Sequence, residues 1–428
     1  MSEQEIAELG PAFAAYLSRF RACFPQRRTA AHFDTFCRGL LSDLPRKSVE
    51  PIALEAGTAV RTLQEFLATT QWDHEQARDR VQQRLATVLA ELPADDLGTV
   101  GVIDETSCSK WGDQTPGVQR QYLGCVGKID NGIVTVHVGV AQGTFQALLD
   151  ADLYLPQAWA LDRPRCREAG IPDDVGYRPK WRIALDQLIR LRDNGVSFDW
   201  LTFDEGYGSK VPLLWVLGLV GQQFVAEVPV NFAVRRSAQG RARRADEQQP
   251  ARRTAKWERF RLERKTQAHQ VWRARSTRVW VAEGWHQLIT AINEATGEVK
   301  YFVTNAVEEP LSRVLRVAFR RATIEHAFRL AKQESGLMHY EGRQYVGLIR
   351  HVILATIVLG FVAEQTQRLR GEKSGGDGGA GVPGVEPALR PSAEPSARCA
   401  GTTTPERSDL LSPTAECSSD PVPQETAA

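Results

Sequence analysis

Three acidic side chains in this sequence could together hold divalent cations. Asp104 ends an apolar segment at 99–103 and Asp204 ends a second one at 198–203, and both segments are typical of buried strands. The third acid, Glu325, lies in a segment with helical spacing of its apolar residues. Carboxylates without a Cys or His cluster suit the hard cations Mg²⁺ or Mn²⁺. Two such ions, about 3.5–4 Å apart, can activate water or a 3′-hydroxyl and stabilise the leaving oxygen when a phosphodiester is cut.

Two cationic side chains accompany Glu325 on its helix. Arg321 precedes it by four residues and Lys332 follows it by seven, so the three share one stripe of the helix. Guanidinium and ammonium groups are the usual partners of phosphate. We therefore expect Asp104, Asp204 and Glu325 to be catalytic metal ligands, and Arg321 and Lys332 to bind phosphates.

Ordinary explanations exist for each acid taken alone. An Asp after an apolar strand is commonly a turn former or a helix cap, and a Glu four residues after an Arg commonly forms an ion pair on the helix surface. The order strand, strand, helix, with a basic segment before the helix, is more specific than its parts. Among competing acids, Glu105 points away from the side of Asp104 in an extended strand, and Glu334 lies across the helix from Glu325. Glu341 is not excluded by geometry.

The order of elements predicts a mixed α/β core that carries a β-rich insertion. The segments on either side of Gly57 are typical of two short helices, which form either a helix-turn-helix or a plain helical hairpin. Asp130-Asn-Gly132 predicts a hairpin turn between strands at 121–128 and 133–140. Helices are expected at 310–320, 322–334 and 345–368. The expected regions are a helical, possibly DNA-binding domain at 1–97, a first core segment at 98–233, a basic β-rich insertion at 234–308, a second core segment with the catalytic helix at 309–370, and a disordered tail at 371–428.

A net charge of +1 hides a strong asymmetry along the chain. The segment 235–278 has fifteen Lys and Arg against four Asp and Glu, whereas 371–428 has four against nine. Such a basic block is either a solvated face or a surface that binds nucleic-acid phosphates. The Trp residues in and beside it either stack on bases or form the core of the insertion. They are Trp257, Trp272, Trp280 and Trp285.

Composition indicates a protein of the cytoplasm. The seven cysteines are scattered and have no zinc-binding spacing, as in a reducing compartment. The apolar run at 352–363 is shorter than the roughly 20 residues that cross a bilayer, so we expect a buried helix and no membrane partner.

Short motifs surround the three acids. They are Val-Ile-Asp-Glu-Thr at 102–106 with Lys-Trp-Gly at 110–112, Gly-Val-Gln-Arg-Gln-Tyr-Leu-Gly-Cys-Val-Gly-Lys at 117–128, Asp-Leu-Tyr-Leu-Pro-Gln-Ala-Trp at 152–159, Ala-Gly-Ile-Pro at 169–172, Thr-Phe-Asp-Glu-Gly-Tyr-Gly at 202–208, Ile-Glu-His-Ala-Phe-Arg-Leu-Ala-Lys-Gln-Glu-Ser-Gly-Leu at 324–337 and Tyr-Glu-Gly-Arg at 340–343. Over about 33–368, the chain resembles the DDE transposases of bacterial insertion sequences, in the IS701-like branch of the IS4 superfamily.

This resemblance implies an RNase H-like catalytic core. The superfamily's helix signature, Tyr-x2-Arg-x3-Glu-x6-Lys, falls on Arg321, Glu325 and Lys332, but its Tyr falls on Ala318. One phosphate contact of the family is therefore in doubt here. The resemblance also implies that the helical N-terminal region binds element ends and that a dimer acts on paired ends.

Taken together, these features predict a DDE-type transposase, an endonuclease and polynucleotidyl transferase. We expect it to cleave and join double-stranded DNA at the terminal inverted repeats of an insertion sequence and in target DNA. The expected cofactor is Mg²⁺ or Mn²⁺, as two ions, and the expected setting is a homodimer on DNA in the nucleoid. One alternative is a non-catalytic DNA-binding protein derived from a decayed or domesticated transposase. A weaker alternative is a host nuclease that cuts DNA but never joins ends.

Overall fold

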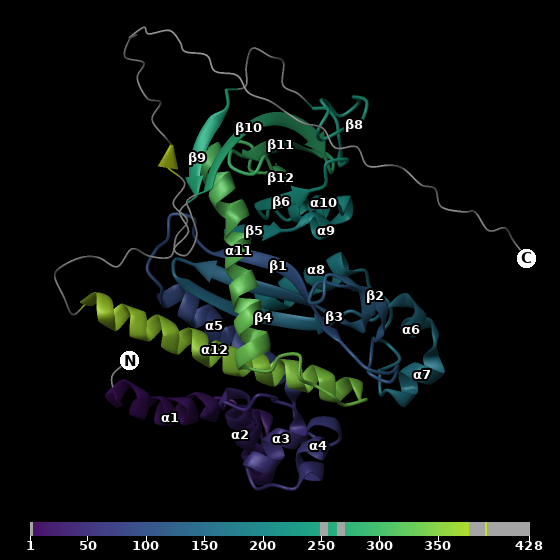
Figure 1. Ribbon diagram of the computed structural model, residues 1–428, viewed down its shortest axis with the longest axis vertical. Helices are drawn as coiled ribbons and strands as arrows, with labels where there is room; N and C mark the ends of the chain where they lie inside the picture. The colour runs from purple at the N-terminus through teal and green to yellow at the C-terminus, as the bar shows by residue number, and fades with distance from the viewer. Residues whose placement is uncertain (1–2, 249–255, 263–269, 376–389, 392–428) are drawn as a thin grey trace, which may run out of the picture. The chain divides into compact units, whose positions relative to one another are not determined.

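The computed structural model describes residues 3–248, 256–262, 270–375 and 390–391 (Figure 1). In the helical segment 323–333 it describes the backbone and not the side chains. Statements below about the structure refer to these residues.

A large mixed β-sheet forms the centre of the fold. Its strands follow the order β13-β9-β10-β11-β12-β6-β5-β1-β3-β2, and β4 pairs with β3. The pairs β1–β5 and β5–β6 are parallel, and the remaining pairs are antiparallel. The strands of the core are β1 (Val100–Ser109), β2 (Gln119–Leu123), β3 (Lys128–Gln142), β4 (Phe145–Leu153), β5 (Trp200–Phe203) and β6 (Phe224–Val228). The β-rich segment adds β9 (Glu258–Leu262), β10 (Gln270–Val281), β11 (Gly284–Asn293) and β12 (Val299–Thr304), with β13 (Arg390–Pro391) at the edge, and β7 (Ala233–Val234) pairs with β8 (Arg243–Arg244) in a separate sheet.

Helices pack against this sheet and against one another. The N-terminal helices are α1 (Glu3–Ser18), the short 3₁₀ helix η1 (Arg21–Cys23), α2 (Arg27–Leu41), α3 (Val49–Glu55), α4 (Val60–Ala68) and α5 (His74–Glu91). Between the strands lie α6 (Gln157–Leu161), α7 (Arg163–Glu168), α8 (Lys180–Asp193), α9 (Glu205–Gly208) and α10 (Val211–Leu219). The chain closes with α11 (Leu311–Glu334) and α12 (Tyr345–Gly375). The predicted mixed α/β fold with a large sheet is confirmed, and it is consistent with the RNase H-like core that the resemblance implies.

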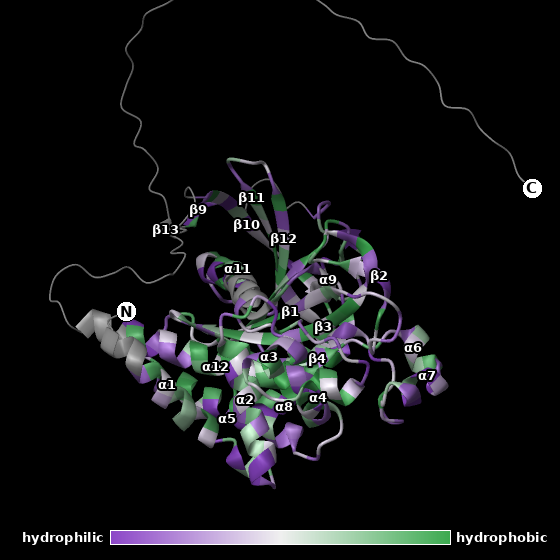
Figure 2. Ribbon diagram, turned by 60° about the horizontal axis from the view of Figure 1, so that its bottom comes forward, coloured by the Kyte–Doolittle hydropathy of each residue, from purple (hydrophilic) through white to green (hydrophobic). Residues whose placement is uncertain are grey.

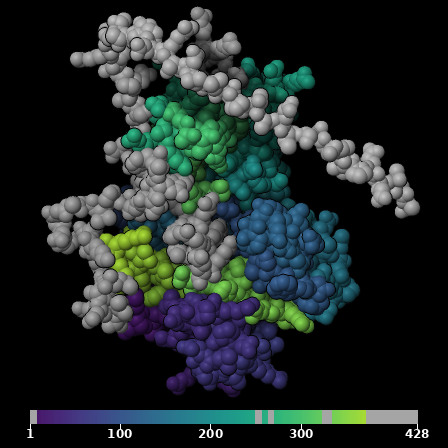
Figure 3. All heavy atoms as spheres, in the orientation of Figure 1, coloured from purple at the N-terminus to yellow at the C-terminus, as the bar shows by residue number. Residues whose placement is uncertain are grey.

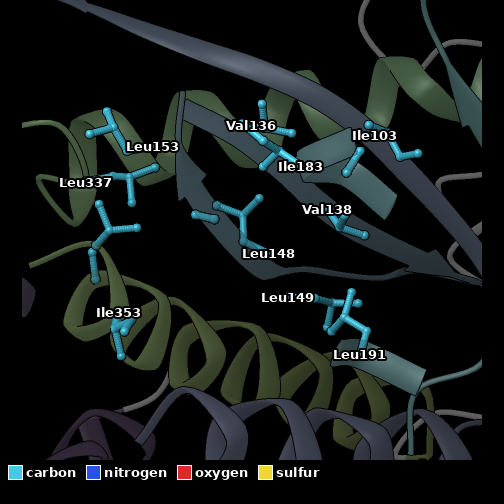
Figure 4. Packing of buried hydrophobic residues seen from close by; sticks show 14 of the residues in the cluster. Ile103, Val136, Val138, Leu148, Leu149, Leu153, Ile183, Leu191, Leu337 and Ile353 are labelled. Carbon is cyan, nitrogen blue, oxygen red and sulfur yellow. The ribbon is translucent and has the colours of Figure 1, made fainter. Parts of the chain in front are cut away.

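One core joins the sheet to its covering helices. In Figure 4, side chains of β1, β3 and β4 meet those of α8 and α12, among them Val136, Leu148 and Ile353. Strand β3 is buried on both faces over most of its length, since the Val residues at every second position from 134 to 140 and the residues between them are all buried. Figure 2 shows the apolar residues gathered where α12 passes the other helices and β4.

The N-terminal helices are docked on α12 (Figure 3). The buried guanidinium of Arg350 in α12 donates hydrogen bonds to the carbonyl oxygens of Leu67, Thr70 and Trp72 at the end of α4. These oxygens have no partner within a helix that ends there, so Arg350 satisfies them and ties the two elements together. Helices α3 and α4 flank Gly57, as the sequence predicts, and Gly57 has the positive φ of 61° that a tight turn needs.

Helix α12 is the one described helix long and apolar enough to cross a membrane, with a mean hydropathy of 2.2. However, 72% of that apolar stretch is buried inside the protein, as in the core helix of a folded domain. This agrees with the buried helix expected at 352–363. The expected disordered tail lies outside the described residues, apart from the end of α12 and β13, and the division into five regions stays a prediction.

Two sequence predictions were wrong in detail. Strand β3 runs without a turn through Asn131 and Gly132, and the chain instead turns at 124–127, where Gly127 has a φ of 68°. Gly132 is required for close packing, since a Cβ atom there would lie 2.3 Å from the carbonyl oxygen of Cys108 in β1. The helices expected at 310–320 and 322–334 form one continuous helix, α11.

A buried ion pair fixes α11 relative to the sheet. Arg320 and Asp95 have side chains that are only 1% and 3% exposed, and their charged groups are 3.0 Å apart. The Asp95 carboxylate also accepts hydrogen bonds from the backbone N–H groups of Leu97 and Gly143. Asp95 therefore ties α11 both to the segment that enters β1 and to the β3–β4 turn.

Replacing Asp95 with Ala should lower the free energy of unfolding by about 3 kcal/mol, because it leaves the Arg320 charge buried without its carboxylate. Urea denaturation of the purified chain measures this. Asp96→Ala is the matched control, because Asp96 is 58% exposed in its pair with Arg316 and should cost about 1 kcal/mol or less. An equal loss of stability from the two substitutions would contradict the claim that the pair of Arg320 and Asp95 fixes α11.

A second buried group makes stability depend on pH. His351 in α12 is fully buried, and its Nε2 atom lies 2.9 Å from the carbonyl oxygen of Gly336. Burial lowers the pKa of His351 to about 4 from its usual 6.5. At pH values between these two pKa values, His351 is protonated in the unfolded chain and neutral in the folded chain. Lowering the pH through this range therefore favours unfolding.

We expect the free energy of unfolding to fall by about 3 kcal/mol through His351 as the pH drops from 6.5 to 4. Other His residues contribute as well, so the measured quantity is the difference between the wild type and His351→Gln in urea denaturation at pH 7 and pH 5. The variant should lose less stability than the wild type, and parallel losses would rule out His351 as the cause.

Candidate active site

Asp104 lies within β1, and Asp204 directly follows β5, the neighbouring parallel strand. In the register of β1 and β5, Ile103 lies opposite Phe203, and each aspartate is the next residue of the chain after this pair. Residues in register on neighbouring strands face the same side of the sheet. The β1–β5 pairing thus brings two carboxylates together from positions 100 residues apart in the sequence.

Each aspartate is held by its local backbone. The side chain of Asp204 caps α9 and accepts a hydrogen bond from the backbone N–H of Tyr207 at 3.3 Å. Asp204 therefore serves as a helix cap, the ordinary role expected of such a residue, whether or not it also binds a metal ion. Asp104 accepts a hydrogen bond from the N–H of Glu105 through Oδ1, and its Oδ2 lies 3.5 Å from Nη1 of Arg321.

Arg321 belongs to α11, which packs against β1, β5 and β6 (Figure 1). Its guanidinium lies between Asp104 and a further acid, Glu227 in β6, whose Oε2 is 3.7 Å from Nη2. The expected role of Arg321 in binding DNA phosphates stays a prediction. A guanidinium at this place can bind a phosphate group or balance the charge of the acids.

Glu227 is the acid that sequence reasoning missed. Ala226 pairs with Phe203, so Glu227 continues the row formed by Asp104 and Asp204 on a third parallel strand. Its Oε1 atom lies 2.6 Å from the ammonium nitrogen of Lys300 in β12. The signal was available in the sequence, since Glu227 is the one charged residue within the apolar strand Phe224–Val228.

The other acids near the site have different partners. Glu105 forms an ion pair with Lys180 of α8 at 2.6 Å, whereas its neighbour Asp104 contacts α11. Two adjacent residues that reach different helices are in keeping with the expected alternation along the strand. Glu341 pairs with Arg46, away from this row of acids.

A buried tyrosine lies beneath the carboxylates. The hydroxyl of Tyr207 is buried and has no hydrogen-bond partner among the described side chains. Burial raises the pKa of Tyr207, and the negative charges of Glu105, Asp204 and Asp104 raise it further. The phenol therefore stays neutral and remains able to donate a hydrogen bond.

Glu325 and Lys332 lie in the portion of α11 whose side chains are outside the described residues, so their roles remain predictions. Glu325 is one helical turn beyond Arg321 on a helix that packs against β1 and β5. Among the described side chains, no three His, Cys, Asp or Glu residues form a metal-binding group. The two aspartates are hard oxygen donors that fit Mg²⁺ or Mn²⁺, and a third carboxylate from α11 would complete such a set.

Comparison with known proteins identifies the family. A family model for the DDE superfamily endonucleases matches residues 19–291, which is well over half of the chain. The chain belongs to this family. It is also similar to a curated relative from Microchaete diplosiphon, described as a probable transposase for insertion sequence element IS701. The two are 33% identical over 224 residues, and the match spans 51% of this chain and 52% of the relative. The chain thus matches about half the length of that relative.

The contact between Glu227 and Arg321 leads to a test of this DDE site. Glu227→Gln removes an anion that draws the guanidinium away from Asp104, so Arg321 should compete more strongly with a cation for that carboxylate. We expect the Mn²⁺ concentration for half-saturation to rise about fivefold, which corresponds to roughly 1 kcal/mol. The electron paramagnetic resonance signal of unbound Mn²⁺, recorded with the full chain and no DNA, measures it.

Glu298→Gln is the matched control. Glu298 also contacts Lys300, at 3.6 Å, and the substitution is the same, but no contact joins it to Arg321 among the described ion pairs. Its Mn²⁺ affinity should equal that of the wild type. Unchanged or tighter Mn²⁺ binding by Glu227→Gln would contradict the proposed competition.

Proposed function

We propose that this protein is a transposase that cuts and joins DNA at the ends of an insertion element by two-metal phosphoryl transfer. The observation that carries the proposal is the parallel pairing of Ile103 with Phe203, which the two aspartates directly follow, in a chain of the DDE superfamily endonucleases. The similarity to a probable IS701 transposase supports the element-specific aspect of the proposal.

In this proposal each residue has a defined task. Asp104, Asp204 and Glu325 hold Mg²⁺ or Mn²⁺, which when bound activates the attacking oxygen and stabilises the leaving one. Arg321 is already beside Asp104 and holds a phosphate of the DNA, as Lys332 does further along α11. Burial and the nearby negative charges raise the pKa of Tyr207, so its hydroxyl stays protonated and adds no further negative charge beside the carboxylates.

The β-rich segment supplies a basic surface for DNA. Three of its arginines lie over tryptophan rings: the exposed Arg273 and the half-buried Arg275 over Trp257, and the exposed Arg278 over Trp285. Trp272, by contrast, is buried in the core, so the Trp residues of this segment divide between the two expected roles. A surface of this kind binds the phosphate backbone and can also stack on bases. Its partner is double-stranded DNA, both terminal inverted repeats and target, bound by a homodimer in the cytoplasmic nucleoid.

One observation favours a second candidate, a non-catalytic DNA-binding protein derived from a transposase. Ala318, at the place of the signature Tyr, is buried with Phe319 in the core shared with the β-rich segment. A side chain without a hydroxyl at this position makes no phosphate contact. The two candidates differ in Mg²⁺-dependent nicking of DNA.

Asp104→Asn should abolish Mg²⁺-dependent nicking of a supercoiled plasmid that carries the element ends, because the amide is a much weaker cation ligand than the carboxylate. Its affinity for the same DNA should stay within about twofold of the wild type, since phosphate contacts elsewhere supply most of the affinity. Gel-based nicking and fluorescence anisotropy measure the two quantities.

Asp193→Asn is the control for this experiment, because Asp193 is 67% exposed and lies at the end of α8. It should nick DNA at the wild-type rate. Nicking by Asp104→Asn at that rate would overturn the catalytic assignment, and a wild type that binds DNA in Mg²⁺ without nicking it would favour the second candidate.

A further inference from the structure

Trp111 is the most exposed large apolar residue among those that the structure describes. Its side chain is 99% exposed, whereas Trp159, Trp200 and Trp272 are fully buried. It belongs to the Lys-Trp-Gly motif at 110–112, which directly follows β1, and the proposed chemistry gives this motif no task. A single exposed apolar residue is common on protein surfaces, so exposure alone assigns no role.

The segment that carries Trp111 is held from both sides. The side-chain amide of Asn131 in β3 donates hydrogen bonds to the carbonyl oxygens of Lys110 and Gly112, both at 2.7 Å. The N–H of Lys110 returns a hydrogen bond to the carbonyl oxygen of Asn131 at 2.9 Å. The ammonium group of Lys110 binds the carbonyl oxygen of Met338 at 3.3 Å. The backbone on each side of Trp111 is thus fixed before any partner arrives, which lowers the entropy lost on binding.

The surroundings of Trp111 carry more positive than negative charge. Arg165 of α7 donates to the carbonyl oxygen of Asp113. A hydrogen bond from Gln114, and then the charges of Arg165 and Arg343, lower the pKa of Asp113. Arg46, paired with Glu341, lies close enough to Lys110 to help lower the pKa of its ammonium group, which burial lowers most. An exposed indole among cations complements a polyanion with aromatic bases, which is the chemistry of DNA.

Trp111 lies beyond the strand that carries Asp104. Asp104 is within β1, which ends at Ser109, and Trp111 follows in a bend of the chain. The residue is therefore separate from the row of acids.

We propose that Trp111 stacks on an unpaired or unstacked base of bound DNA. This inference rests on the proposed function, because it takes DNA as the substrate of the site. It adds a base contact outside the row of acids and outside the basic β-rich segment.

The test compares two DNA probes on the full chain without metal. One is a labelled duplex of about 30 base pairs, and the other is the same duplex with a short unpaired loop. Trp111→Ala should weaken binding to the looped duplex about fivefold to a hundredfold, as expected for the loss of one stacked base, and change binding to the paired duplex less than twofold. Trp111→Phe should restore most of the affinity, because it keeps an aromatic face.

Trp215→Ala is the matched control, since Trp215 is 45% exposed on α10 and should have no effect on either probe. Equal binding of both probes by Trp111→Ala and the wild type would overturn the inference. So would a change in oligomeric state by analytical ultracentrifugation without a change in DNA binding, which would make Trp111 a protein contact. Absence of nicking by the wild type would count against the proposed function alone, because the stacking test needs no cleavage.

Discussion

The parallel pairing of β1 with β5 is the constraint on which the site depends. Ile103 lies opposite Phe203, so Asp104 in β1 and Asp204 at the end of β5 each follow a paired residue at the same level of the sheet. A slip of one residue would turn one of the two carboxylates to the other face of the sheet. The register is protected because both strands are buried within the sheet and covered by helices. The core of this fold therefore does more than stabilise the chain: it sets the distance between the acids.

A row of acids is costly unless cations neutralise it, and the structure supplies them from two elements. Arg321 of α11 contacts Asp104 and Glu227, and Lys300 of β12 contacts Glu227 from the other side. Arg321 can occupy this place because its neighbour Arg320 is anchored to Asp95. Helix α11 thus carries Arg320, which fixes the position of the helix, and next to it Arg321, which contacts the acids of the candidate site. Incoming metal ions and DNA phosphates would exchange with contacts that already exist within the protein.

Sequence patterns placed both aspartates at strand ends, which is correct for Asp204 but wrong for Asp104, since β1 continues from Val100 to Ser109. Sequence patterns also failed where a contact is distant in the sequence. Asp104 and Asp204 stood out because an acid after an apolar run is visible locally. The role of Glu227 depends on which strands are neighbours in the sheet, and no local pattern gives that. Gly132 has the signature of a turn, but it serves the close approach of β1 and β3. Likewise, the motif around Trp111 was visible in the sequence, whereas the hydrogen bonds from Asn131 that hold its backbone depend on the distant strand β3. Glu325 remains a sequence prediction.

The most direct test of the central claim is the location of a bound metal. Crystals of the full chain grown with Mn²⁺, with data collected near the manganese absorption edge, give an anomalous difference map that shows the ion independently of any assumed chemistry. The account predicts a peak in contact with the carboxylates of both Asp104 and Asp204. A peak bound elsewhere, with these two side chains still engaged only with protein groups, would contradict it.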